Sequence, residues 1–274
     1  MQYLPGPQEA RSMSTDQLRA NFLVQNLFVA GEIGFRHIDL DRVVLGGAVP
    51  TSAALRLTAP ESLAAEHFTE RRELAVLNIG AAGSISVDGD RFGVQSKDIL
   101  YIGRGHLDVR FESDDPANPA RFYIVSYPAH TSHPTALVRR SDVQGAEVGD
   151  AAHANQRRIA RFVHAGGALS DQLVIGVTEL SEGSVWNTMP AHTHHRRTEV
   201  YLYFGLPAEA VVIHLMGEPE QTRHLVVRDG EAVLSPGWSI HAGCGTTNYS
   251  FCWAMGGENQ DYADMQSVNL NSLR

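Results

Sequence analysis

Short apolar runs, separated by glycines and Asp-Gly turns, dominate this chain of 274 residues. They are too short for stable helices and rich in Val, Ile, Leu and aromatic residues, so they predict β-strands. The runs are 39–47, 74–80, 83–89, 98–103, 121–126, 172–180, 199–204, 210–216, 224–227, 231–234 and 249–254. Short strands at near-regular spacing are typical of a sandwich or barrel. We expect a mainly β protein with few short helices, one of them over 14–23, where capping residues precede an amphipathic stretch.

The two halves of the chain resemble each other. The segment Glu70–Gly80 is similar to His195–Gly205, and Asp98–His106 is similar to Glu231–His241. Their order and approximate separation agree, as expected after duplication of a β-barrel.

The regular succession of short apolar runs is interrupted between residues 130 and 155, where prolines, glycines and a pair of arginines replace them. We interpret this stretch as the crossing between two domains. The predicted domains are 1–140 and 150–274.

The second half carries a pattern typical of a metal site. His192 and His194 are two positions apart, so they share one face of an extended strand, whereas His195 points to the other face. Glu199 follows after four residues, and His241 ends a Ser-Pro-Gly-Trp turn segment. Three imidazole nitrogens and a carboxylate oxygen suit zinc, manganese, iron or nickel.

Other residues near this pattern have two readings. Tyr201 and Tyr203 share the parity of Glu199 and fit either the same cavity or an aromatic core. Counting back from Glu73, the first half has Glu66 and Phe68 in place of His-x-His, so we expect no metal there.

Cationic residues could bind a substrate carboxylate through paired hydrogen bonds. Arg223 is the candidate, and a solvated charge at a strand edge is the alternative. Arg196 and Arg197, beside the metal pattern, have the same two readings.

Composition narrows the class of protein. A hydrophobic fraction of 43% and a charged fraction of 19% describe an ordinary globular chain. The net charge of −9 argues against general affinity for nucleic acid or anionic membranes. Only two cysteines occur, and no apolar stretch has the length of a signal peptide or membrane span, so we expect a cytoplasmic protein.

The metal pattern and the repeated half resemble the cupins, and two such barrels make a bicupin. Five residues separate Glu199 from Gly205, whereas six are usual in cupins. This departure from the general cupin pattern favours a resemblance to one particular family of cupins. The whole chain resembles the bicupin family of 5-dehydro-4-deoxy-D-glucuronate isomerases, also called 4-deoxy-L-threo-5-hexosulose-uronate ketol-isomerases. The phrases that carry the resemblance are Phe68–Leu74, Trp186–Pro190, Gln221–His224, Ser239–His241 and Gly257–Gln260.

The resemblance implies two cupin-type jelly-roll barrels, the first a degenerate one without a metal motif. It implies one Zn²⁺ per subunit on His192, His194, Glu199 and His241, with other divalent metals possible. It further implies a cytoplasmic homo-oligomer, usually a hexamer, that acts in pectin breakdown. Such an enzyme converts 5-dehydro-4-deoxy-D-glucuronate to 3-deoxy-D-glycero-2,5-hexodiulosonate. The sequence does not single out the general base, for which Glu218, His224 and Glu258 are open candidates.

Three alternatives share these residues. One is a cupin isomerase acting on 5-deoxy-glucuronate, which differs in substrate alone. Another is a cupin dioxygenase, which would use the same ligands with Fe(II). The third is a non-catalytic sugar-binding cupin.

Overall fold

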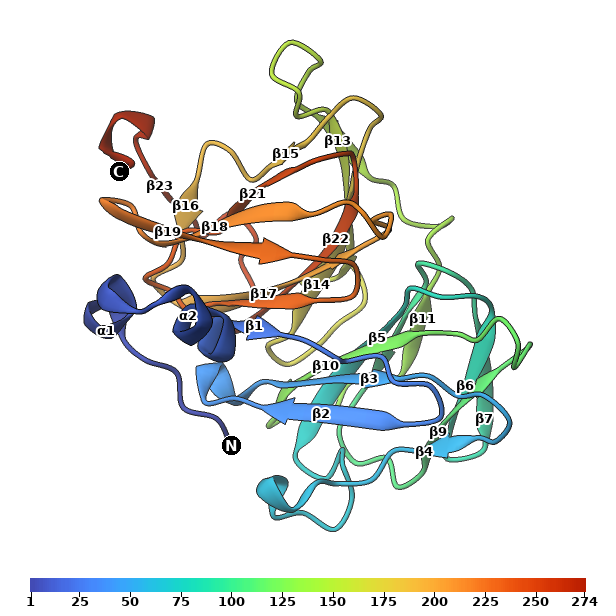
Figure 1. The fold of residues 1–274 in the computed structure, drawn as a ribbon. Helices are drawn as coiled ribbons and strands as arrows, with labels where there is room; N and C mark the ends of the chain where they lie inside the picture. Colours follow the sequence, from blue (N-terminus) through green and yellow to red (C-terminus); the bar gives the residue numbers. More distant parts are fainter. The chain divides into compact units, whose positions relative to one another are not determined.

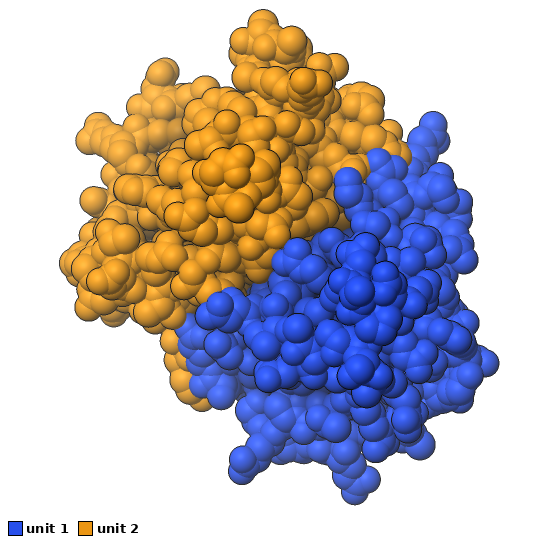
Figure 2. Space-filling view, turned by 45° about the vertical axis from the view of Figure 1, so that its right-hand side comes forward, with its two compact units in different colours: residues 1–2, 26–144, 162–175 blue, residues 3–25, 145–161, 176–274 orange.

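The computed structural model describes residues 1–274 and is mainly β, as predicted (Figure 1). The chain divides into two compact units, coloured separately in Figure 2. Unit 1 comprises residues 1–2, 26–144 and 162–175, and unit 2 comprises 3–25, 145–161 and 176–274. No helix has both the length and the apolar character needed to cross a lipid bilayer.

Unit 1 contains two antiparallel sheets. The strand order is β11-β8-β5-β10-β3-β2 in one sheet and β4-β9-β6-β7 in the other. Two 3₁₀ helices, Leu40–Arg42 and Glu61–Leu63, lie in the connections. The strands are β2 (Ile33–His37), β3 (Val44–Ala48), β4 (Leu55–Arg56), β5 (Arg72–Asn78), β6 (Gly83–Val87), β7 (Asp90–Val94), β8 (Ile99–Ile102), β9 (Val109–Ser113), β10 (Phe122–Pro128) and β11 (Ala136–Val138).

A hydrophobic core fills the space between these two sheets. It takes Leu74 and Val76 from β5 and Ile85 and Phe111 from the facing sheet, all fully buried. Because strand side chains alternate, Glu73 lies on the opposite face of β5 from this core. Leu74, and not Glu73, therefore occupies the inward position that Glu199 holds in unit 2. The sequence comparison that matched Glu73 with Glu199 was wrong by one residue.

Unit 2 is built in the same way around a larger sheet. The orders are β1-β20-β17-β22-β14-β13-β12 and β15-β21-β18-β19, with β16 and β23 forming a separate pair. The end of β13, residues 162–163, and the start of β14, residues 174–175, are counted with unit 1. The strands are β1 (Leu23–Val24), β12 (Ala146–Val148), β13 (Arg157–Val163), β14 (Val174–Leu180), β15 (Trp186–Asn187), β16 (His192–Thr193), β17 (Arg197–Phe204), β18 (Val212–Glu218), β19 (Gln221–Val227), β20 (Ala232–Ser235), β21 (Ala242–Gly245), β22 (Ser250–Gly257) and β23 (Gln266–Ser267). A 3₁₀ helix, Leu270–Ser272, follows β23.

Aromatic and polar side chains meet between the two larger sheets of unit 2. The rings of Tyr201, Tyr203 and Phe251 come from the β17–β22 side and contact one another at 4.8 to 6.1 Å between centroids. From β18, the buried His214 places Nδ1 2.8 Å from the Tyr203 hydroxyl. The interior of this unit is thus more polar than the apolar core of unit 1.

The N-terminal segment belongs to unit 2. Helices α1 (Pro7–Ser12) and α2 (Thr15–Phe22) precede β1, which pairs with β20. The predicted helix over 14–23 is confirmed: Ser14 caps α2, and its hydroxyl accepts the Gln17 N–H in a capping box.

One predicted strand was too long. Within the run 39–47, residues Leu40–Arg42 form a 3₁₀ turn and the strand begins at Val44. Asp41 and Arg42 have φ values of 45° and 54°, a left-handed backbone that no strand contains.

Candidate metal centre and pocket

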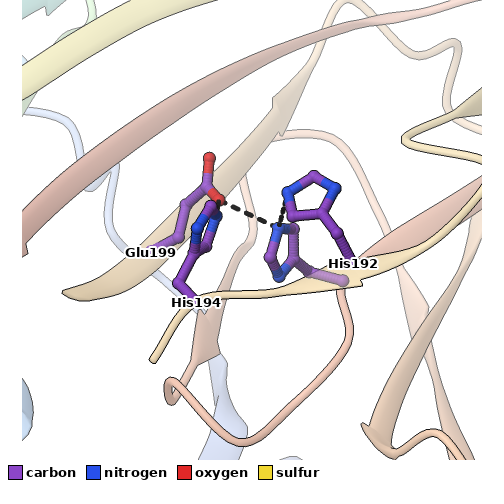
Figure 3. Close-up of side chains that lie close together, drawn as sticks. His192, His194 and Glu199 are labelled. Carbon is purple, nitrogen blue, oxygen red and sulfur yellow. Dashed lines mark hydrogen bonds and ion pairs between the residues drawn. The ribbon is translucent and has the colours of Figure 1, made fainter. Parts of the chain in front are cut away.

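Three elements of unit 2 bring the four predicted ligands together. His192 and His194 lie in and just after β16, and Glu199 is on β17 (Figure 3). His241 directly precedes β21. The turn before His241 approaches the His194 segment so closely that a Cβ on Gly237 would lie 2.4 Å from the His194 carbonyl oxygen. Glycine at this position therefore permits the two segments to meet.

The side-chain atoms of the four residues converge. His194 Nε2 lies 2.9 Å and His241 Nε2 lies 3.0 Å from the same oxygen, Glu199 Oε2. His192 Nε2 is 3.0 Å from His241 Nε2. The four ligand atoms all lie within 4.8 Å of one another. His192 is half-buried, and the other three side chains are buried.

Hydrogen bonds behind the rings orient their nitrogens. His194 Nδ1 is 2.8 Å from the Asp264 carbonyl oxygen, which can only accept, so the Nδ1 atom carries the proton. The Nε2 of His194 then faces the Glu199 carboxylate at 2.9 Å. His241 Nδ1 is held by the Ser235 hydroxyl at 3.1 Å.

This arrangement fits a divalent cation. Lone pairs of imidazole and carboxylate repel one another when they converge, and a cation between them removes the repulsion. Ligands about 2.0–2.1 Å from a tetrahedral ion are roughly 3.3 Å apart, which falls within the spacing seen here. Outer hydrogen bonds that fix the tautomer of a ligating histidine are a general feature of metal sites.

The electrostatics agree with this interpretation. Burial lowers the pKa of His192 to about 3, so its imidazole is neutral. Burial alone would raise the pKa of Glu199, but the neighbouring His241 and His194 outweigh it and hold the pKa below its ordinary value. Metal binding requires these forms, a neutral imidazole and an ionised carboxylate.

The cluster forms one wall of a cavity of about 250 Å³ in unit 2. The remaining walls are largely aromatic and apolar, and Glu199 is the one carboxylate among them. The residues beside the three ligands His192, His194 and Glu199 are Arg157, Ile159, Thr178, Thr188, Met189, Pro190, Arg197, Tyr201, Phe251, Trp253, Met255, Tyr262 and Met265. A lining of this kind suits a small organic ligand.

The predicted cationic residues have different surroundings. Arg197 lines the cavity, but its guanidinium donates to the carbonyls of Asp261, Tyr262 and Asp264 and so secures that loop. Arg223 is not among the lining residues, and it donates to the carbonyls of Ala10, Arg11 and Met13. Its binding of a substrate carboxylate stays a prediction.

The three candidates for the general base also lie outside the lining. Glu218 forms an ion pair with Arg11 at 2.7 Å, and His224 is exposed on β19. The backbone N–H of Glu258 donates to the Arg196 carbonyl. Tyr201, in contrast, does line the cavity, whereas Tyr203 lies among the aromatic rings of the interior.

Sequence reasoning missed Arg157, Trp253 and Tyr262. They come from β13, from β22 and from the loop after it, and no short motif joins them. The parity of Trp253 with Phe251 on one strand was the available signal.

The fold and the cluster define a class: a cupin-type β protein with a candidate metal centre. Of the solved structures similar to this chain, an IolB-like protein from Salmonella typhimurium has a TM-score of 0.74 at 14% identity, over 90% of this chain and 97% of that one. Oxalate decarboxylase from Lactobacillus farciminis has a TM-score of 0.59 at 11% identity, over 89% of both chains. At these identities the likeness concerns the fold alone.

Residues 27–270 match the model of the KduI/IolB family, and the chain belongs to that family. It is 51% identical to a protein of Kineococcus radiotolerans over 275 residues, 99% of each chain. It is 49% identical to one of Opitutus terrae over 276 residues, 100% of this chain and 99% of that one. Both relatives are named 4-deoxy-L-threo-5-hexosulose-uronate ketol-isomerase. The chain is thus an enzyme, an intramolecular oxidoreductase of the ketol-isomerase type.

Proposed function

We propose that this isomerase converts 5-dehydro-4-deoxy-D-glucuronate to 3-deoxy-D-glycero-2,5-hexodiulosonate, with a divalent metal, in the breakdown of pectin and related uronate polymers. The observation that carries the proposal is the convergence of His192, His194, Glu199 and His241 within 4.8 Å at the wall of a cavity. The names of the full-length relatives support the choice of substrate.

The reaction moves a carbonyl group from C1 to C2 without changing the composition of the sugar. C2 loses a proton and C1 gains one, while the hydroxyl proton on O2 is replaced by one on O1. When bound, the metal supplies Lewis-acid chemistry that polarises the carbonyl and stabilises negative charge developing on the two oxygens.

Contacts within the chain hold the side chains of the site in place for this step. The Asp264 carbonyl and the Ser235 hydroxyl hold the rings of His194 and His241 in place. Thr188 holds the Tyr201 hydroxyl at 3.0 Å, and burial raises the pKa of this phenol well above its ordinary value, so it stays protonated. Aromatic and apolar side chains line the cavity beside these residues.

A coupled assay on the unsaturated-uronate breakdown product, with and without chelator, tests the function. Turnover that chelator abolishes and metal restores supports it, and absence of turnover with metal-loaded enzyme refutes it. Oxygen uptake during turnover would instead favour an Fe(II) dioxygenase. Binding of sugar without conversion would favour a sugar-binding module.

We infer a proton-transfer route through an enediolate. In deuterated water, this route places solvent deuterium at C1 of the product. Product without deuterium at C1 would contradict the enediolate and favour a direct hydride shift from C2 to C1.

Zinc is the metal we propose, with one ion per subunit, because three imidazoles and a carboxylate form a tetrahedral set that zinc accepts. Metal analysis of the purified protein tests this identity. The hexameric assembly and the cytoplasmic location stay predictions, which sedimentation analysis and cell fractionation would check.

A further inference from the structure

The cavity contains a cation whose charge the protein does not balance. Arg157, the first residue of β13, lines the cavity together with Ile159 of the same strand. The hydrogen bond of its guanidinium runs from Nη1 to the Asn155 carbonyl at 2.7 Å. That bond engages one of five N–H groups, so most of the planar fork remains available to a ligand.

No acidic side chain of the cavity pairs with this guanidinium. Glu199 is the one carboxylate in the lining, and its Oε2 already faces His194 and His241. Burial lowers the pKa of Arg157, the mark of a cation that is partly removed from water. A half-buried cation without a carboxylate partner is costly to the folded protein, and an anionic ligand would offset that cost.

The second arginine of the cavity is engaged elsewhere. Arg197 donates to three backbone carbonyls of the loop after β22, at 2.5, 3.0 and 3.2 Å. Arg157 is therefore the cationic group that can receive an anion without breaking hydrogen bonds of the loop.

From these contacts we propose that Arg157 binds the carboxylate of the substrate. Two parallel N–H···O bonds between guanidinium and carboxylate give both affinity and orientation. Because Arg157 and three of the cluster residues line the same cavity, the proposal places the opposite end of the six-carbon chain towards the histidine cluster. Arg157 then selects uronate-derived sugars over neutral ones, an inference that rests on the proposed isomerase function.

The neighbouring arginine on the same strand provides a matched control. Arg158 is adjacent but points to the other face of β13, where Glu179 lies 3.7 Å away and Glu147 lies 4.0 Å away. It does not line the cavity. The substitution R158Q thus removes the same charge from the same strand without touching the site.

The experiment compares R157Q, R157K and R158Q with the wild-type holoenzyme. For R157Q we expect KM to rise roughly 10- to 100-fold with a much smaller change in kcat, because charge-assisted hydrogen bonds to the substrate are lost. R157K keeps the positive charge but lacks the planar guanidinium, so its KM should lie between those of the wild type and R157Q. R158Q should match the wild type, and metal content should be the same in all four proteins.

A second measurement separates this inference from the proposed function. D-Galacturonate and D-galactose differ mainly in the carboxylate, and their binding can be compared by calorimetry. The wild type should prefer the uronate, and R157Q should lose that preference. Failure of the wild type to convert the substrate would refute the proposed function. Equal uronate preference and equal KM in R157Q and the wild type would overturn the role of Arg157, as would loss of the preference in R158Q.

Discussion

A buried carboxylate in unit 1 has no part in the chemistry and offers a sharp test of the structure. Glu73 is fully buried, on the face of β5 opposite the apolar core. Its Oε1 accepts the N–H groups of Gln172 and Leu173, both at 2.8 Å. Its Oε2 accepts the Asp171 N–H and the Tyr101 hydroxyl, both at 2.7 Å. Four donors and no acceptor surround this side chain.

The substitution Glu73→Gln keeps the shape and inverts part of the hydrogen bonding. In either orientation of the amide, its NH₂ group faces two donors in place of an accepting oxygen. Burial and the neighbouring Glu73 raise the pKa of Tyr101, so its hydroxyl is a protonated donor in the wild type. Opposite an amide NH₂ this hydroxyl can rotate and accept, whereas the backbone N–H groups of residues 171–173 cannot. At least one charge-assisted hydrogen bond is therefore lost, at about 1.5–3 kcal/mol, and the backbone donor left unpaired costs about 1–3 kcal/mol more, which gives a destabilisation of about 2.5–6 kcal/mol.

Thermal and urea unfolding followed by circular dichroism measure this loss. At about 2–4 °C per kcal/mol, the midpoint should fall by roughly 5–24 °C. The control is Glu112→Gln on β9, where the glutamate is 43% exposed and pairs with Arg91 at 3.3 Å, so the change should stay within about 0.5 kcal/mol. A Glu73→Gln protein as stable as the Glu112→Gln protein would refute the reasoning, and with it the described surroundings of Glu73.

Further predictions concern the metal centre and the interior of unit 2. His192→Ala should lower metal affinity at least tenfold by equilibrium dialysis, whereas His195→Ala, which removes an imidazole outside the cluster, should leave it unchanged. Removal of the metal by chelator should lower the thermal midpoint in the same dialysis series, because an ion that binds the folded state stabilises it by mass action. Tyr203→Phe should cost about 1–3 kcal/mol in urea unfolding with kcat largely retained, because it leaves the buried Nδ1 of His214 without its partner. Burial lowers the pKa of His214 to about 3, so between about pH 6.5 and pH 3 the unfolded chain binds a proton at this residue and the folded chain does not. The free energy of unfolding should therefore fall by about 1.4 kcal/mol for each pH unit towards pH 3. The substitution His214→Asn should remove this part of the pH dependence in urea unfolding.

The four converging residues could be predicted because their arrangement depends mostly on local geometry. The alternation of an extended segment determines that His192 and His194 share a face, and the repeat of the two halves aligns His241 with the end of another strand. The two-sheet architecture followed from the spacing of short runs in the same way. Neither prediction needed knowledge of distant contacts.

The errors have equally local causes. The register counted from Glu73 failed because Glu73 and Leu74 are both buried, so burial alone does not reveal which of them faces the core. The strand expected from residue 39 failed at Asp41 and Arg42, whose left-handed backbone has no signature in side-chain polarity. In both cases the apolar pattern was compatible with two backbone arrangements.

The division into domains depends on long-range contacts. Residues 3–25 cluster with the second unit because β1 pairs with β20 and Arg19 donates to the Val226 carbonyl at 2.8 Å. Residues 162–175 cluster with the first unit, where Glu73 receives the N–H groups of residues 171–173. Such exchanges of segments leave no trace in composition, so the ranges 1–140 and 150–274 could not include them.

The residues that select the substrate could not be predicted from the His/Glu metal pattern, because they too are brought together by long-range contacts. Three of the four cluster residues, His192, His194 and Glu199, follow one another along one stretch of chain, but the cavity beside them is completed by β13, by β22 and by the loop that Arg197 holds. A fold shared with oxalate decarboxylase at 11% identity can support a different reaction, because the chemistry resides in the side chains that each chain brings to the cavity. The proposed metal centre would account for activation of a carbonyl group, whereas Arg157, which no motif marks, is the residue we expect to decide which sugar reaches it.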